Sequence, residues 1–179
     1  MNRDLTDRIF NISGLTDFQN KTLEIFRFQA ENNQIYRDFI KLLNIDPSDV
    51  TSMEDIPFLP AGIFKSHKII SGPDEALMIF ESSGTSGNMT SRHYITNPGI
   101  YEMSFLKGFS LFYGDPADYF IAALLPSYSE RENSSLIYMV KGLIKRSRVP
   151  CSGFYTKNIN ELLQNIEKSL SERRKVILI

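Results

Sequence analysis

Apolar residues recur at helical spacing through residues 17–43, which is the pattern of an amphipathic helix. Thr16 and Gln19 form a capping-box pattern at its start. The stretch predicts one long helix, or two helices with a break near Asn32 and Asn33. Its apolar stripe is assigned to core packing and consists of Phe18, Ile25, Phe28, Ile35, Phe39 and Leu42.

A second pattern, in which short apolar runs alternate with amphipathic stretches, fills the later part of the chain. It predicts strands at 92–96, 118–125, 151–155 and 175–179. Helices are expected between them, beginning at caps on Asn97, Asn133 and Asn158. Strictly alternating strands and helices are typical of a parallel sheet. The expected fold is α/β: an N-terminal helical segment followed by a mostly parallel sheet with crossover helices.

The domain organisation follows from the segment between these two patterns. Residues 47–75 contain four of the eight prolines, which predicts an irregular connection with short turns. We expect a single domain over 1–179, with a helical and irregular lead-in at 1–75 and an α/β part at 76–179. The apolar strand at 175–179 has no polar residue after it, and terminal residues are normally polar. We therefore expect the chain to be the N-terminal portion of a longer protein.

Composition limits the cellular compartments and the classes of binding partner that we expect. The chain has 20 basic and 21 acidic residues, so neither nucleic acid nor an anionic membrane is expected to attract it. Cys151 is the one cysteine, which favours a reducing compartment. No apolar run is long enough to span a bilayer, and the first residues are too charged for a signal peptide. A cytoplasmic location is expected.

The strongest candidate for chemistry is a polar loop between runs 76–80 and 92–96, both of which read as strands. It contains Ser82, Ser83, Gly84, Thr85, Ser86 and Gly87. By composition alone it is first a hairpin loop. Its density of glycine and hydroxyl residues also suits a phosphate cradle, because successive backbone N–H groups form an anion-binding nest. It is neither a P-loop nor a dinucleotide-binding turn.

The same six residues resemble the signature loop of the adenylate-forming enzymes. Flanking stretches narrow the resemblance to the acyl-protein synthetase (LuxE) family: Ile56–Pro60 and Ile63–Ser66 upstream, Ser91–His93, and Leu124–Arg131 and Ser134–Met139 downstream. The resemblance extends from about Ile56 to the last residue. It implies a fold like the N-terminal part of the large domain of an adenylate-forming enzyme.

The resemblance also implies an activity. Members activate a long-chain fatty acid with ATP and Mg²⁺, and they pass the acyl group to a protein thiol that serves an acyl reductase. The loop residues Ser82–Gly87 would hold the phosphates. Arg92 would add a cationic donor, or would face solvent. Asn88-Met89-Thr90 stands where the wider superfamily has Pro-Lys, so the loop lacks that lysine.

Other candidate residues carry less chemistry. Ser127 and Tyr128 follow the strand at 118–125, at the edge where α/β sheets bind ligands. They are either a wall of the acyl or adenine pocket or part of a surface turn. We assign Cys151 to packing and not to the acyl acceptor, since no base lies near it in sequence. His67 and His93 have no acidic partner at ligand spacing.

Three functions remain open from the sequence. The first is a segment of an acyl-protein synthetase. The second is a ligase similar to phenylacetate-CoA ligase, which would pass the acyl group to coenzyme A. The third is a non-catalytic module that binds a nucleotide or scaffolds a partner. The later motifs of the superfamily do not occur in the 179 residues, so we expect the isolated chain to be incomplete as a catalyst.

Overall fold

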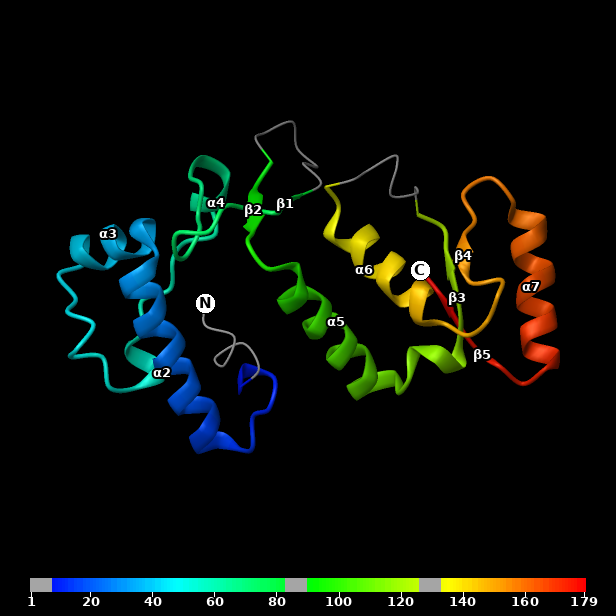
Figure 1. The fold of residues 1–179 in the computed structure, drawn as a ribbon, viewed down its shortest axis with the longest axis horizontal. Helices are drawn as coiled ribbons and strands as arrows, with labels where there is room; N and C mark the ends of the chain where they lie inside the picture. The colour runs from blue at the N-terminus through cyan, green and yellow to red at the C-terminus, as the bar shows by residue number, and fades with distance from the viewer. Residues whose placement is uncertain (1–7, 83–89, 126–132) are drawn as a thin grey trace. The chain divides into compact units, whose positions relative to one another are not determined.

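The computed structural model describes residues 8–82, 90–125 and 133–179, and it divides into two compact units. The first unit is Met1–Ile100 and the second is Tyr101–Ile179. Figure 1 shows the elements of both units in sequence order along the ribbon. None of the helices in the described residues is long and apolar enough to cross a membrane.

Two consecutive helices dominate the first unit: α2 (Leu15–Asn32) and α3 (Gln34–Leu42). The predicted break is confirmed, and it falls at Asn33. This residue leaves helical geometry, and its side-chain oxygen accepts a hydrogen bond from the backbone N–H of Tyr36, 3.1 Å away. Asn33 thus ends α2 and caps α3, as a short polar side chain can.

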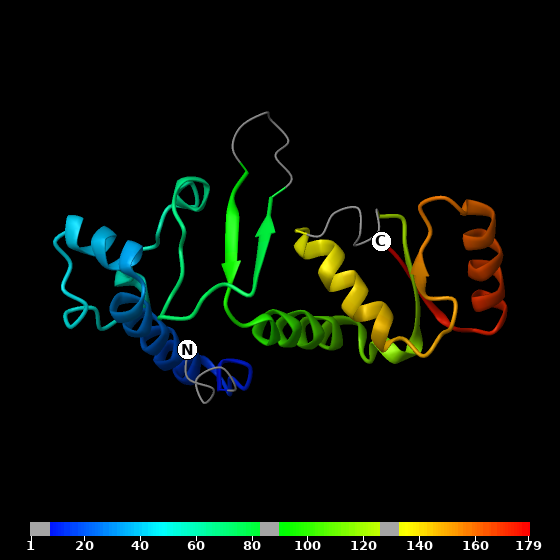
Figure 2. The ribbon, with the colours of Figure 1, turned by 45° about the horizontal axis from the view of Figure 1, so that its top comes forward.

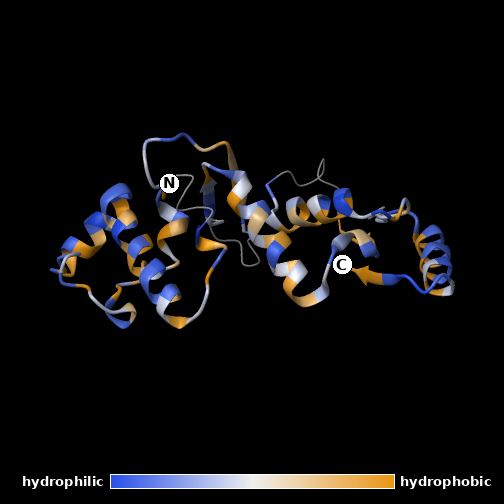
Figure 3. Cartoon of the chain, turned by 60° about the horizontal axis from the view of Figure 1, so that its bottom comes forward, coloured by the Kyte–Doolittle hydropathy of each residue, from blue (hydrophilic) through white to orange (hydrophobic). Residues whose placement is uncertain are grey.

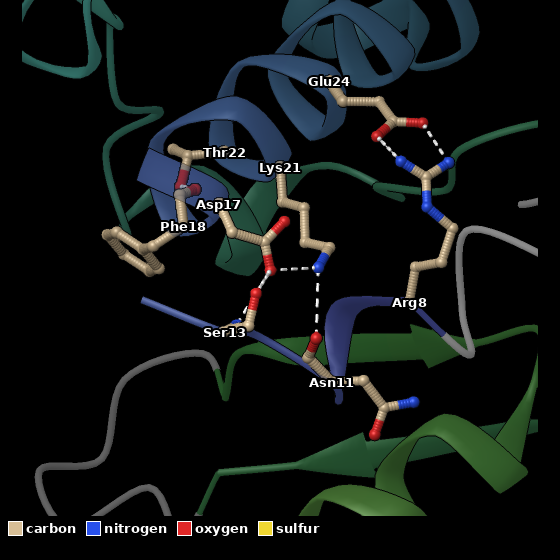
Figure 4. Close-up of polar contacts among 8 residues, drawn as sticks. All are labelled: Arg8, Asn11, Ser13, Asp17, Phe18, Lys21, Thr22 and Glu24. Carbon is tan, nitrogen blue, oxygen red and sulfur yellow. Dashed lines mark hydrogen bonds and ion pairs between the residues drawn. The ribbon is translucent and has the colours of Figure 1, made fainter. Parts of the chain in front are cut away.

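The start of α2 differs from the prediction. Gly14 occupies the N-cap position without a side-chain cap, so the capping box at Thr16 and Gln19 was wrong. Asp17 fastens the first turn instead, accepting hydrogen bonds from the N–H of Ser13 at 2.9 Å and from Lys21 Nζ at 2.6 Å (Figure 4). The Lys21 hydrogen bond, followed by that of Ser13, lowers the pKa of Asp17. An acidic side chain here also suits the positive end of the helix dipole.

The core of the first unit lies beside the stripe that the sequence predicted. Its buried members are Phe26, Ala30, Tyr36, Ile40, Val50 and Ile56. Phe18 and Leu42, both assigned to the core, are 41% and 82% exposed. Figure 3 shows hydrophobic and hydrophilic positions interleaved on the described helices. The apolar surface of α2 and α3 is broad, so spacing alone did not select the buried face.

Irregular chain with two short helical turns, η1 (Met53–Asp55) and α4 (Ile63–Ser66), connects α3 to a hairpin. This connection was predicted. The hairpin consists of β1 (Met78–Glu81) and β2 (Arg92–Ile95), which pair antiparallel (Figure 2). The sequence had placed the strand at 92–96 in the parallel sheet, and this was wrong. Within the described residues β2 pairs with β1 alone.

The second unit is built on a parallel sheet of three strands in the order β4-β3-β5. The strands are β3 (Tyr119–Ala123), β4 (Gly153–Phe154) and β5 (Lys175–Leu178). Their helices are α5 (Pro98–Tyr113), α6 (Ser135–Arg146) and α7 (Ile159–Ser171), and a short turn, η2 (Pro116–Asp118), precedes β3. Every predicted helix and strand of this unit is present.

Both faces of this sheet are covered. On one face Phe120 and Ala122 pack with Leu162 of α7. On the other, Tyr119 and Ile121 pack with residues of α5 and α6. All five residues of β3 are buried, as its continuous apolar sequence predicted. The α/β class is thus confirmed, with a parallel sheet that is smaller than expected.

The predicted caps of the later helices are correct to within one residue. Ser134, and not Asn133, caps α6, because its hydroxyl accepts a hydrogen bond from the N–H of Ile137. Asn158 precedes α7 as expected. Its side chain donates to Glu161 at 2.7 Å rather than bonding to the helix backbone.

Candidate functional site

In the sequence, the predicted phosphate loop lies between β1 and β2, the two strands of the hairpin. Its register pairs Phe80 with His93 and Glu81 with Arg92. Two further hydrogen bonds join Ser82 and Ser91: the N–H of Ser82 donates to the Ser91 carbonyl at 3.1 Å, and the N–H of Ser91 donates to Ser82 Oγ at 3.0 Å. Hydrogen bonding between the two sides of the hairpin therefore continues as far as Ser82 and Ser91. The predicted residues Ser83, Gly84, Thr85, Ser86 and Gly87 lie outside the described residues.

Arg92 is held at the base of this loop. Its Nε lies 2.9 Å from a carboxylate oxygen of Glu81, directly across the hairpin, and more than half of its side chain is exposed. This hydrogen bond raises the pKa of Arg92 above its ordinary value. Arg92 therefore faces solvent with its Nε engaged by Glu81, and its donation to a phosphate stays a prediction.

Helix α4 and the residues after it lie against β2. The Phe64 ring stacks on His93 with centroids 4.7 Å apart, and Lys68 Nζ lies 5.6 Å from the centre of the Tyr94 ring. Since neighbouring residues of a strand face opposite ways, these contacts hold β2 from both faces. They place a second cation, Lys68, beside the hairpin. The sequence analysis missed it, because the signal is a tertiary cation–π contact.

The histidines do not form a metal site in the described residues. The ring of His93 is stacked on Phe64, and His67 Nδ1 shares a hydrogen bond with the Ser66 hydroxyl at 2.8 Å. Within the described ranges no three His, Cys, Asp or Glu side chains gather as they would around a metal ion. A Mg²⁺ ion bound with a nucleotide is commonly held by one or two carboxylates together with phosphate oxygens. Glu81, already paired with Arg92, is the acidic side chain at the hairpin base.

The remaining predicted residues belong to the second unit. Ser127 and Tyr128 lie outside the described residues, which stop at Leu125 in this region. Leu124 donates its N–H to the carbonyl of Ile179 at 2.7 Å, so the chain follows the carboxyl end of the sheet to that point. Cys151 is partly buried and packs against the cluster around Phe120. This contact matches its assignment to packing.

Comparison with protein families gives a match in the first unit. The family model of the acyl-protein synthetases, LuxE, matches residues 14–95. Residues 14–95, just under half of the chain, are similar to the LuxE acyl-protein synthetases. The match begins at the residue before α2 and ends with the last residue of β2, so it contains both long helices and the whole hairpin with its loop. No curated protein and no solved structure matches the chain.

The extent of the match differs from the expected resemblance. It begins at Gly14, well before Ile56, and thus includes the helices to which the sequence analysis gave no family character. It ends at Ile95, so the stretches Leu124–Arg131 and Ser134–Met139 lie outside it. The matched family is that of the acyl-protein synthetases, with the adenylate-forming superfamily as its wider context.

Proposed function

We propose that this chain takes part in the ATP-dependent activation of a fatty acid to an acyl-adenylate, for transfer to a protein thiol that serves an acyl reductase. The observation that carries the proposal is the LuxE match, because it spans both strands of the β1–β2 hairpin and the glycine-rich sequence between them. The substrate, the acceptor and the reductase partner follow from the family and are part of the proposal.

The chemistry required is chiefly the binding of charge. A carboxylate oxygen attacks the α-phosphorus, the bond between the α-phosphate and the leaving group breaks, and pyrophosphate departs. In this proposal backbone N–H groups of Ser83–Gly87 bind the phosphate oxygens, with the hydroxyls of Ser83, Thr85 and Ser86 as added donors. Mg²⁺, when bound, would neutralise phosphate charge.

The described residues contribute rigidity and charge at the base of the loop. The hydrogen bonds between Ser82 and Ser91 fix where the loop leaves the strands. Arg92 is oriented by Glu81, which leaves the outer edge of its guanidinium able to donate to an anion. Lys68 adds positive charge beside the same hairpin. In this arrangement Arg92 and Lys68 attract the nucleotide, and the loop supplies the close contacts.

ATP–pyrophosphate exchange, run on the 179-residue chain and on a C-terminally extended protein with panels of fatty and aromatic acids, tests the proposal. We expect exchange with fatty acids in the extended protein. We expect Gly84→Val and Gly87→Val to abolish it there, because a side chain at either position would obstruct the approach of phosphate to the backbone. Gly62→Val is the matched control. Its φ is −60°, and an added Cβ meets no atom within 4 Å, so exchange should be unchanged.

Other outcomes separate the alternatives. Exchange followed by acyl transfer to coenzyme A, and not to a protein thiol, would favour a ligase similar to phenylacetate-CoA ligase. ATP binding without exchange for any acid would indicate a non-catalytic nucleotide-binding module. If Gly84→Val and Gly87→Val both exchanged like the unaltered chain, the phosphate-cradle role of the loop would be excluded.

A further inference from the structure

An apolar groove of about 400 Å³ lies in the first unit, between α2 and the irregular segment that follows α3. Its size is within the usual range for small-molecule sites. The apolar side chains that form most of its wall include Ile25, Phe26, Ile56, Leu59, Phe64 and Ile69. None of the residues of β1 or β2 is among the described residues that line the groove, and no role has been given to it so far.

One wall of the groove runs along α2. The lining residues there are Thr22, Ile25, Phe26, Gln29 and, just after the helix, Asn33, which form one stripe along the axis. Thr22 and Asn33 are eleven positions apart, which at about 1.5 Å per residue is roughly 16 Å. A wall of this length suits an extended alkyl chain better than a single aromatic ring.

The lining is uncharged: among the described residues that form the groove there is no Asp, Glu, Lys, Arg or His. Most of its polar groups are already bonded within the protein. Tyr36 donates its hydroxyl to the Pro57 carbonyl at 2.7 Å, and Asn33 Nδ2 donates to Ser71 Oγ at 3.2 Å. A carboxylate would lose its hydration here without gaining a cation, which is costly. The groove therefore fits hydrocarbon.

One wall of the groove connects it to the hairpin. Phe64 lines the groove, and the same ring stacks on His93 of β2. The cations of this region, Arg92 and Lys68, are also fixed on β2, by Glu81 and by the Tyr94 ring. An acid with its chain in the groove can thus keep its charged end outside, on the side of the hairpin where positive charge is found.

We propose that the groove binds the alkyl chain of an aliphatic carboxylic acid. The inference rests on the proposed function, because this acid is the one to be activated. Binding of the alkyl chain itself requires neither ATP nor the loop. Straight-chain acids bind with their methylenes against Ile25, Leu59 and Ile69. The carboxylate stays at the Phe64 end, beside the hairpin.

The test is a titration of the 179-residue chain, without ATP, with straight-chain acids from hexanoate to hexadecanoate and with phenylacetate and benzoate. The readout is calorimetry below the micellar concentration of each acid. We expect affinity to rise by about fourfold per added methylene until the groove is filled, as expected for burial of apolar surface. The aromatic acids should bind at least tenfold more weakly than the best aliphatic acid.

Two variants locate the binding. Ile69→Trp fills the groove and should weaken binding of the best acid by at least tenfold. Phe58→Ala removes a wall residue whose side chain is 79% exposed, so it reports on the groove even if Ile69→Trp fails to fold. It should weaken binding several-fold. Leu42→Trp and Leu42→Ala are the matched controls, because Leu42 is 82% exposed and does not line the groove, and both should bind as the unaltered chain does.

The inference would be overturned by affinity that does not depend on chain length, by tighter binding of the aromatic acids, or by unchanged binding in folded Ile69→Trp and Phe58→Ala. Lack of binding by every acid would also overturn it and would leave the groove to a protein partner. Exchange with fatty acids that persists without groove binding would retain the proposed function alone. Chain-length-dependent binding without exchange would retain the groove alone.

Discussion

Tyr36 connects packing and hydrogen bonding at a single residue of the first core. Its ring packs edge-on against Phe26, with centroids 6.1 Å apart, and its hydroxyl donates to the Pro57 carbonyl. Burial raises the pKa of Tyr36 to about 12. The bonded hydroxyl fixes the irregular segment against α3, and this segment forms one wall of the groove.

We expect Tyr36→Phe to lower the free energy of unfolding by about 1 kcal/mol at neutral pH, since the Pro57 carbonyl loses its donor. The unfolded chain ionises tyrosine near pH 10, whereas the folded chain keeps Tyr36 protonated until about pH 12. The advantage of the unaltered chain is thus complete below pH 10 and declines as the pH rises toward 12. Urea unfolding at pH 7 and at about pH 11 measures both effects.

The control for this variant is Tyr113→Phe, at a side chain more than half exposed, which should change stability little at either pH. A Tyr36→Phe deficit that stayed the same at both pH values would contradict the role given to burial.

The sequence predicted some of these residues and missed others for identifiable reasons. Asn33 was found because a short polar residue interrupts a helical pattern. Tyr36 was not placed in the core, because its burial depends on a hydrogen bond from its hydroxyl to the carbonyl of Pro57, 21 residues away. The pairing of Arg92 with Glu81 was equally hidden, since it requires the hairpin register. Periodicity reports which face is apolar, but it does not report which partner a polar atom will find.

At the scale of elements, helices and strands were predicted well where the chain alternates between them. The continuous apolar sequence of β3 and the cap at Asn97 predicted β3 and the start of α5 to within two residues. The predicted pairing of β2 was wrong for a topological reason. A strand followed by a helix enters a parallel sheet only if its neighbour also lies there, and the polar loop at 83–89 instead joins β2 to β1 as a hairpin.

The packing of α5 against α6 depends on Gly142. A Cβ at this position would lie 2.6 Å from Cζ of Phe105, which is 8% exposed and belongs to the second unit's core. Alanine in a helix interior gains up to about 1 kcal/mol over glycine. Forcing a methyl into a packed core costs about 1–3 kcal/mol. We expect the overlap to dominate, so Gly142→Ala should lower stability by about 1 kcal/mol in thermal or urea unfolding.

Gly108 provides the matched comparison in α5. An added Cβ there meets nothing within 4 Å, so Gly108→Ala should raise stability by up to about 1 kcal/mol. Combining Gly142→Ala with Phe105→Leu should remove most of the Gly142→Ala penalty, because the opposing ring is gone. An undiminished penalty in the double variant would place the strain elsewhere than at Phe105.

At the scale of the whole molecule, the sequence predicted the class of fold and the family whose model matches residues 14–95. That model also covers α2 and α3, which carried no family motif in the sequence. The match covers the first unit from Gly14 to Ile95. Its helices looked like generic core elements in sequence, yet α2 provides one wall of the groove. Such a role depends on how the irregular segment packs against the helix. Only the tertiary structure contains this information.

The two units also have separate buried cores, and this leads to a prediction for the molecule as a whole. Ile40 belongs to the core of the first unit and is 1% exposed, whereas Ile121 belongs to that of the second and is 0% exposed. Replacing either by alanine should cost about 2–5 kcal/mol locally, by loss of buried surface and creation of a cavity. Amide hydrogen exchange on the full chain distinguishes the two effects.

We expect Ile40→Ala to reduce protection chiefly in α2 and α3, and Ile121→Ala to reduce it chiefly in β3, β5 and α6. The two substitutions are chemically identical, so each serves as the control for the other. Equal loss of protection across both units in both variants would mean that the chain opens as one cooperative body. Selective loss would mean that the groove and hairpin of the first unit are stabilised by the core of that unit. In that case, binding of an acid should protect the amides of α2 in the Ile121→Ala variant as well as in the unaltered chain.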